Sequence, residues 1–261
     1  MSKPRDRSIE LIRSRKNHVC YGMGLGIMVL DDVYPGLPGD VRNASAYPFP
    51  IQFEIVEGID IQALCYADDK SPCLEPLLRA ARKLERMGCR AIAAECGFFS
   101  YFQREVAAAV EVPVFMSSLL QVPWAQQLIG PDRTVCIVTA DAKLTPEYLI
   151  PVGIDMESNF EILDMAERMP GMEFEKLWSG SYGDPQDPSL RYSVAESQIV
   201  EVLSDHVAAN RKIASLVLEC TGYQPFARAI QQSVDMPVYS WGTLLDYAYS
   251  VVVHRDYYGH V

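Results

Sequence analysis

ECGFFSYFQREVAAAVEVPVFMS occupies residues 95–117, and a second, gapless version of it, ECTGYQPFARAIQQSVDMPVYSW, occupies residues 219–241. Both copies open with the same pair, Glu95-Cys96 and Glu219-Cys220. Each copy follows a short apolar run of the length of a buried strand. The repeat therefore predicts the same unit twice: a strand ending in Glu-Cys, then a helix, then a second short strand.

Apolar runs and helical spacing extend this pattern along the chain. We expect further strands at 19–30, 51–56 and 134–139, helices at 72–87, 119–129, 196–210 and 244–253, and a less regular segment at 141–195. Strands that alternate with helices are typical of parallel sheets. The predicted fold class is α/β, with two pseudo-symmetric lobes, each a mostly parallel sheet flanked by helices. We assign residues 1–117 plus 242–261 to the first lobe and 118–241 to the second.

Composition limits the kinds of partner. The net charge is −11, and no Lys/Arg-rich stripe lies beyond the N-terminal tail, so we expect no nucleic acid. No apolar stretch approaches the about 18 residues that a bilayer-spanning helix needs, so we expect no membrane association. The tail from Lys3 to Lys16 lacks the apolar core of a signal peptide, and the expected compartment is the cytoplasm. There the seven cysteines are expected to be reduced thiols.

We expect a binding and catalytic site where the repeated strands end. In parallel sheets, ligands sit beyond the carboxyl ends of the strands. Cys96, Cys220, the loop 31–50 and the pair Thr139-Ala140 should therefore face one another across the cleft between the lobes. A thiol at a helix start lies near the positive end of the helix dipole, which is expected to lower its pKa. Two facing thiols would form an acid–base pair on opposite sides of one carbon.

These motifs resemble the aspartate/glutamate racemase superfamily, which includes hydantoin racemases, maleate isomerases and arylmalonate decarboxylases. The resemblance covers nearly the whole chain. It rests on Cys96-Gly-Phe, Cys220-Thr-Gly-Tyr, Val138-Thr-Ala and Gly39-Asp-Val-Arg-Asn43. It implies an active site in the cleft between the lobes, with catalysis that needs no pyridoxal phosphate, other cofactor or metal. Superfamily members are often dimers, so a homodimer is one expected assembly.

The resemblance and the strand-end rule together define a candidate site. The candidate catalytic residues are Cys96 and Cys220. The candidate substrate-binding residues are Asn43, Gly97, Phe98, Ser117, Ser118, Thr139, Ala140, Thr221 and Gly222. Backbone N–H groups at the two turns are expected to stabilise a carboxylate or an enolate oxygen. Because Gly97-Phe98-Phe99 replaces the polar residues typical of the amino-acid racemases, we expect a substrate more apolar than glutamate or aspartate.

The leading functional prediction is a cofactor-independent racemase or epimerase. One cysteine would remove a proton next to a carboxylate or carbonyl, and the other would return a proton to the opposite face. The substrate would be a small carboxylic acid, an amino acid or a hydantoin-like molecule. The same cysteines would also serve a maleate-type cis–trans isomerase or an arylmalonate-type decarboxylase. A protein that only binds small carboxylates is the non-enzymatic alternative.

Other reactive residues have structural interpretations. The cysteines outside the repeat are expected to be small core residues, because free cysteine is among the most buried residue types; they are Cys20, Cys65, Cys73, Cys89 and Cys136. The histidines at 18, 206, 254 and 260 are expected to be solvated at the surface. Glu95 and Glu219 are expected either to orient the site or to form ion pairs, with Arg104 or Arg228 as candidate partners.

Overall fold

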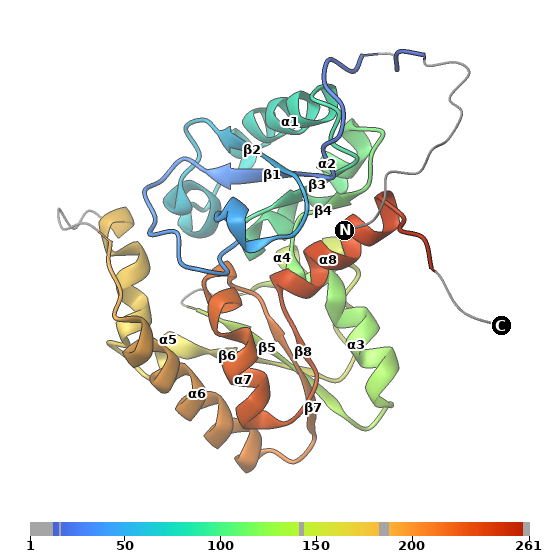
Figure 1. Ribbon diagram of the computed structural model, residues 1–261. Coiled ribbons are helices and arrows are strands. Elements are labelled where there is room, and N and C mark those ends of the chain that lie inside the picture. Colours follow the sequence, from blue (N-terminus) through green and yellow to red (C-terminus); the bar gives the residue numbers. More distant parts are fainter. Residues whose placement is uncertain (1–12, 16, 141–143, 183–187, 258–261) are drawn as a thin grey trace.

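Two parallel sheets of four strands each form the framework of the protein (Figure 1). The computed structural model describes residues 13–15, 17–140, 144–182 and 188–257. The first sheet contains β1 (Leu25–Leu30), β2 (Ile51–Val56), β3 (Ala91–Ala94) and β4 (Val114–Phe115). The second contains β5 (Thr134–Thr139), β6 (Phe160–Asp164), β7 (Ile213–Leu218) and β8 (Val238–Tyr239). The strand orders β2-β1-β3-β4 and β6-β5-β7-β8 are equivalent, which confirms the predicted pseudo-symmetric α/β fold.

Helices connect the strands. The α-helices are α1 (Ser71–Arg86), α2 (Gln103–Ala109), α3 (Val122–Ile129), α4 (Pro146–Leu149), α5 (Met165–Arg168), α6 (Tyr192–Ala209), α7 (Ala227–Val234) and α8 (Trp241–Val252). The 3-10 helices are η1 (Ala44–Ala46), η3 (Gly97–Phe102), η4 (Ser118–Gln121), η5 (Ile150–Val152), η6 (Glu173–Tyr182) and η7 (Thr221–Phe226). A single π-helical turn is assigned among the described residues, η2 (Gln62–Tyr66). None of the described helices is both long and apolar enough to cross a membrane.

The structure differs from the sequence prediction in two elements. Strand β6 lies within the segment 141–195, which we expected to be less regular. Its sequence, Phe-Glu-Ile-Leu-Asp, alternates only partly, because β6 is an edge strand with few fully buried side chains. The first strand was expected to begin at Val19 but begins at Leu25, where the register with both β2 and β3 starts.

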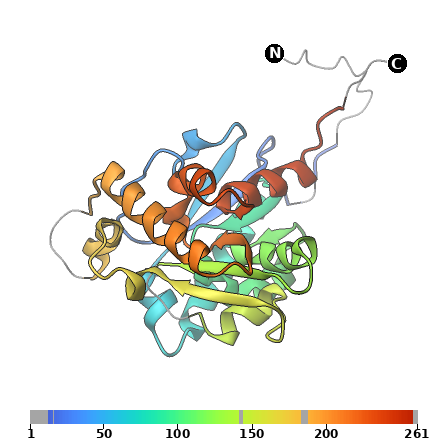
Figure 2. The ribbon, with the colours of Figure 1, turned by 90° about the horizontal axis from the view of Figure 1, so that it is seen from below.

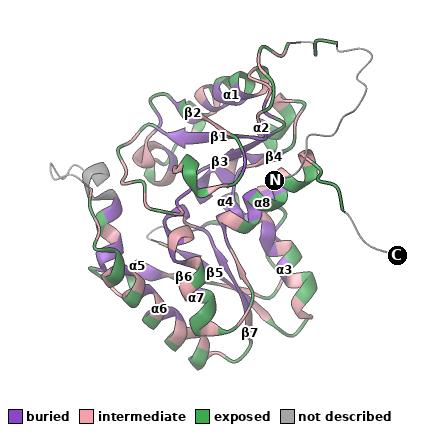
Figure 3. Cartoon of the chain, in the orientation of Figure 1, coloured by how far each residue is buried: buried purple, intermediate pink, exposed green. Residues whose placement is uncertain are grey.

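Alternating side chains of the first sheet pack against helices on its two faces. Met28 and Leu30 point toward α1, into a cluster with Leu77 and Leu84. The residues between them, such as Ile27 and Val29, point to the other face and pack against α8 through Trp241 and Leu244. Both faces are covered, which is why β1 is buried along its whole length (Figure 3).

The second sheet is covered in the same manner. Val138 and Leu218 pack toward α6 and α7. Val135, Ile137 and Val217 face α3 and α4 and belong to the same apolar cluster as the core of the first lobe. The two lobes therefore share one continuous core. Figure 2 shows the ribbon of both lobes from below.

The chain crosses between the lobes once after β4, at Ser118, and once after β8, at Ser240. The Ser118 hydroxyl donates to the carbonyl oxygen of Leu218 at 2.7 Å, and Gln121 donates to the carbonyl oxygen of Ser240 at 2.9 Å. The Trp241 indole N–H donates to the carbonyl oxygen of Glu219 at 2.8 Å. These buried bonds hold the first residues after β4 and β8 against the end of β7.

Candidate active site

The two Glu-Cys turns have matching backbone geometry. The Glu95 amide donates to the carbonyl of Met28 on β1, and the Glu219 amide donates to the carbonyl of Val138 on β5. Cys96 and Cys220 then leave their strands and begin the 3-10 helices η3 and η7. The predicted order of strand, Glu-Cys and helix is therefore present in both lobes.

The structure brings the two predicted cysteines together. Cys96 and Cys220 are near enough that a charge on Cys96 raises the pKa of Cys220. The Phe98 amide donates to the Cys96 sulfur, and the Gly222 amide donates to the Cys220 sulfur, at the equivalent position of each turn. Two of the backbone N–H groups that we expected to hold a substrate oxygen thus act on the sulfurs.

A third thiol belongs to this cluster. Cys65, on the π-helix η2, hydrogen-bonds the Cys96 thiol. Tyr148, from α4 of the second lobe, lies near both sulfurs: burial raises the pKa of its hydroxyl, and the charges of Cys65 and Cys96 raise it further. Cys65 was expected to be a core residue, and the repeat gave no signal for it, since it lies outside both copies.

The predicted lowering of the thiol pKa by a helix dipole is wrong. The hydrogen bond from Cys65 lowers the pKa of Cys96, but burial and the charges of Glu95 and Glu219 raise it more, so the net shift is upward. The pKa of Cys220 lies well above its usual value because of burial first and then the charges of Glu219 and Cys96. Short 3-10 turns contribute a weak dipole, and burial dominates.

The two equivalent glutamates have different partners. Glu95 Oε1 accepts hydrogen bonds from the Leu30 amide at 2.9 Å and from the Arg42 guanidinium at 2.6 Å. Arg42 also pairs with Asp32 at 2.6 Å. The expected partner Arg104 instead donates to the Ile150 carbonyl oxygen.

No cation pairs with Glu219 in the part of the chain that the structure describes. Its Oε2 accepts from the Thr139 hydroxyl at 2.9 Å, while its buried Oε1 has no hydrogen-bond partner among the described residues. Burial raises the pKa of Glu219 to about 8 against the opposing effect of Thr139. Glu219 is therefore a neutral acid at pH 7, and its side chain packs directly on Gly97 of the other turn.

The loop 31–50 reaches across to the second lobe, as predicted. The Tyr34 hydroxyl donates to Asp40 at 3.0 Å and lies 3.2 Å from where a β-carbon would stand on Gly222. Burial is the main cause that raises the pKa of Tyr34 well above its usual value and that of Asp40 to about 7. Neither residue was among the candidate site residues, although the loop itself was expected at the cleft.

The other candidate residues occupy several settings. The Asn43 side chain caps η1 through Ser45 and donates to the Leu37 carbonyl. Ser117 caps η4, and Ala140 accepts from the Ala166 amide. Thr221 is buried beside Cys220 at the start of η7. Contact of these residues with substrate stays a prediction.

Core packing accounts for the apolar residues Gly97-Phe98-Phe99 in the first copy of the repeat. A β-carbon on Gly97 would collide with Glu219, and Phe98 packs edge-on against Tyr148 with ring centroids 4.7 Å apart. Phe99 is fully buried. These residues serve the core, and the expectation of a more apolar substrate stays a prediction.

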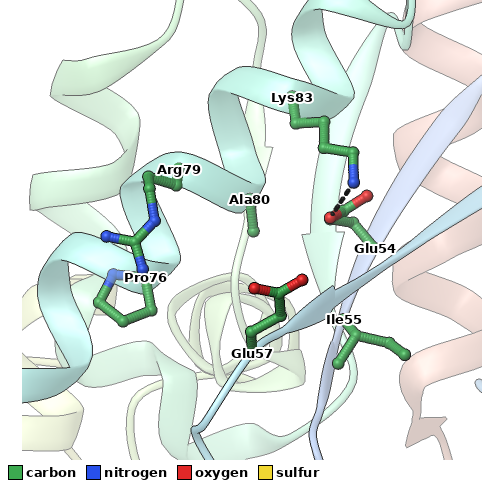
Figure 4. A pocket seen from close by; sticks show the side chains of 7 residues that line it. All are labelled: Glu54, Ile55, Glu57, Pro76, Arg79, Ala80 and Lys83. Atoms are coloured by element: carbon green, nitrogen blue, oxygen red, sulfur yellow. Dashed lines mark hydrogen bonds and ion pairs between the residues drawn. The ribbon is translucent and has the colours of Figure 1, made fainter.

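Two other features lie away from the cleft. A pocket of about 210 Å³ between β2 and α1 contains the Lys83–Glu54 ion pair and no candidate residue (Figure 4). Among the described residues, one cluster has metal-ligand character: Cys136, Glu161 and His206.

Comparison with solved structures defines the class of fold. A mutant of arylmalonate decarboxylase in its sulfate-associated form is similar with a TM-score of 0.57 and 14% identity, over 88% of this chain and 92% of that one. An aspartate racemase homologue from Pyrococcus horikoshii OT3 gives a TM-score of 0.51 and 16% identity, over 86% and 98%. The chain thus has the fold of the aspartate/glutamate racemase superfamily, as the sequence resemblance implied.

The proteins that are similar in sequence are named as lyases, not as racemases or decarboxylases. The chain is 28% identical over 221 residues to a dimethylsulfoniopropionate lyase of Durusdinium sp. clade D, covering 82% of this chain and 70% of that protein. It is 26% identical over 223 residues to dimethylsulfoniopropionate lyase 6 of Emiliania huxleyi (strain CCMP1516), covering 82% and 56%. The chain thus spans little more than half of the second relative. No protein-family model matches it.

Proposed function

We propose that the protein is a lyase that eliminates a leaving group from the β-carbon of a small carboxylate, with dimethylsulfoniopropionate as the first substrate to test. The observation that carries the proposal is the unequal thiol pair, in a chain whose relatives are named as lyases of that compound. An elimination needs one base, whereas a racemisation needs two that exchange roles. Arylmalonate decarboxylase and aspartate racemase sequences are too distant to transfer an activity.

Cys96 is the proposed base. It accepts hydrogen bonds from the Cys65 thiol and from the Phe98 amide, and both favour its thiolate form. Cys220 accepts a hydrogen bond from the Gly222 amide, which favours its thiolate, but burial first and the nearby Asp40 carboxylate as well raise the pKa of Cys220. Cys220 is therefore the proposed proton-bearing group, beside the Tyr34 hydroxyl.

The electrons and the proton balance without a co-reactant. Cys96 as thiolate takes the proton from the carbon next to the carboxylate. The electron pair of that C–H bond becomes the second bond between the α- and β-carbons, and the pair of the carbon–sulfur bond leaves with dimethyl sulfide. The products are acrylate, dimethyl sulfide and the Cys96 thiol, which returns its proton to water.

The charges around the cleft suit such a substrate. Asp40 and the Glu95–Arg42–Asp32 group give this side of the cleft more carboxylates than cations, which favours a sulfonium. The candidate donors to the substrate carboxylate are the Gly97 and Thr221 amides. Burial raises the pKa of Glu219 to about 8, so at neutral pH the charge of Glu219 does little to oppose thiolate formation.

Headspace gas chromatography of dimethyl sulfide, with acrylate measured in parallel, tests this function. We expect turnover in the wild type and a loss of about 10²–10⁴-fold in Cys96→Ser. Cys89→Ser is the matched control, since Cys89 is buried in the first lobe outside the cleft. A folded protein that releases no dimethyl sulfide, or Cys96→Ser at wild-type rate, contradicts the proposal.

Racemisation or epimerisation is the second candidate. The observation in its favour is that Cys96 and Cys220 stand at equivalent turns with equivalent amide donors. Exchange of the α-hydrogen in D₂O, with loss of optical rotation, would be measured on chiral acids, amino acids and hydantoins. Exchange that needs both cysteines, without dimethyl sulfide release, would favour the racemase. Carbon dioxide from an arylmalonate would favour a decarboxylase.

A further inference from the structure

Three potential metal ligands meet between the second sheet and α6. Cys136 on β5 and Glu161 on β6 are direct neighbours in the parallel register, so their side chains lie on the same face of the sheet. His206, in the last turn of α6, packs over them. One ligand atom from each residue lies within 4.8 Å of the other two.

We propose that Cys136, Glu161 and His206 form a zinc-binding site. Thiolate, imidazole and carboxylate are the three ligand types that Zn²⁺ uses, and the combination of soft sulfur with nitrogen favours Zn²⁺ over Mg²⁺ or Ca²⁺. Ligand atoms of a tetrahedral zinc site lie about 3–4 Å apart, which this cluster reaches with small side-chain shifts. The Glu161 and His206 side chains are 29% and 20% exposed, so water can supply a fourth ligand.

The neighbouring Asn210 orients the Glu161 carboxylate. Asn210 donates to Glu161 Oε2 at 2.7 Å, which leaves Oε1 directed at His206 at 2.5 Å. The side-chain oxygen Oδ1 of Asn210 in turn accepts a hydrogen bond from the Lys212 amide at 3.1 Å. Partners of this kind orient metal-binding carboxylates and raise affinity.

Without metal, the same groups satisfy one another. The Cys136 thiol and His206 both bond Glu161, and burial followed by the Glu161 charge raises the pKa of Cys136 far above its usual value. Binding of Zn²⁺ would replace these contacts with three metal–ligand bonds. The Cys136 thiol proton would pass to solvent, so uptake would release a proton.

The site is specific to the second lobe and separate from the cleft. The equivalent position on β1 is Gly26, which packs against Leu84 and Cys89. His206 was expected to be a solvated surface residue, but it is partly buried and paired with Glu161. The sequence contains no Cys-x-x-Cys pair, the spacing typical of structural zinc sites, and ligands from two strands and a helix produce no such signal.

Titration of the full-length, chelator-treated protein with Co²⁺ and Zn²⁺ tests the proposal. We expect one Co²⁺ per chain with a thiolate-to-cobalt charge-transfer band, and displacement of Co²⁺ by Zn²⁺. Cys136→Ser should abolish the band, and Asn210→Ala should weaken binding about 10–100-fold. The Cys65→Ser/Cys96→Ser/Cys220→Ser variant should keep it, which makes the result independent of the proposed lyase activity.

Three outcomes would overturn the site. They are no saturable binding of Co²⁺ in the wild type, a band that survives in Cys136→Ser, and a band that disappears in the variant that lacks the cleft cysteines. His206→Gln is a second test variant, used in case Cys136→Ser fails to fold. It alters a partly exposed side chain. Its circular dichroism should match that of the wild type, while Zn²⁺ should raise the thermal midpoint of the wild type only.

Discussion

The Oε1 atom of Glu219 lies 1.9 Å from the point at which a β-carbon would stand on Gly97. The first residue after Cys96 therefore packs on the residue before Cys220. Thr221 occupies the corresponding position of the second copy. The glycine is thus required by a contact between the two halves of the repeat.

Gly97→Ala should lower the free energy of unfolding by about 1–3 kcal/mol, because a buried side chain must move to admit the methyl group. Urea denaturation measures the loss. Gly36→Ala is the matched control, since a β-carbon at Gly36 meets no atom within 4 Å. Equal stability of the two variants would show that Glu219 can move aside freely.

Glu219→Gln should change how stability depends on pH. The pKa of Glu219 is about 8 in the folded protein, against 4.5 as its ordinary value, so the folded state holds this proton more tightly. Its contribution is complete below pH 4.5 and is lost as the pH rises toward 8, with a slope of at most about 1.4 kcal/mol per pH unit. The variant should match the wild type near pH 4.5 and exceed it at pH 8. Parallel denaturation curves at all pH values would contradict a raised pKa.

Arg42→Met should cost about 3–5 kcal/mol of stability, because it leaves Glu95 and Asp32 without their buried cation. Lys83→Met removes an exposed partner of Glu54 and should cost far less. Chemical denaturation of both variants at low and high salt compares them. A small loss in Arg42→Met would mean that the two carboxyls are protonated in the folded state.

Cys65→Ala should slow alkylation of Cys96 at neutral pH, because the thiol that lowers the pKa of Cys96 is gone. Cys65→Ser keeps a hydrogen-bond donor and should restore much of the rate. Iodoacetamide labelling across a pH series, read by peptide mapping, separates Cys96 from Cys220. An unchanged profile in Cys65→Ala would remove the reason for assigning Cys96 as the base.

Tyr34→Phe should lower kcat of the elimination about tenfold, the effect of one hydrogen bond of about 1.4 kcal/mol. The lost hydroxyl lies beside the Cys220 turn and is held by Asp40. Tyr192→Phe is the control, because its hydroxyl bonds the Pro225 carbonyl at the surface. An equal rate in the two variants would exclude Tyr34 from the reaction.

The sequence predicted the architecture and the meeting of Cys96 with Cys220, because both follow from a repeat with apolar strands and fixed strand ends. It missed Cys65 and Tyr34, since these reach the cleft from segments without periodicity. It also gave the wrong direction for the thiol pKa. That quantity depends on burial and on the side chains facing the sulfur, which local spacing does not encode.

The partners of the two glutamates set the two halves of the repeat apart. The same residue type is an anion neutralised by Arg42 in one half and an uncharged acid beside Thr139 in the other. Both partners come from outside the repeated stretch. A chimera carrying two copies of either half would therefore inherit both cysteines but not the charge balance around them.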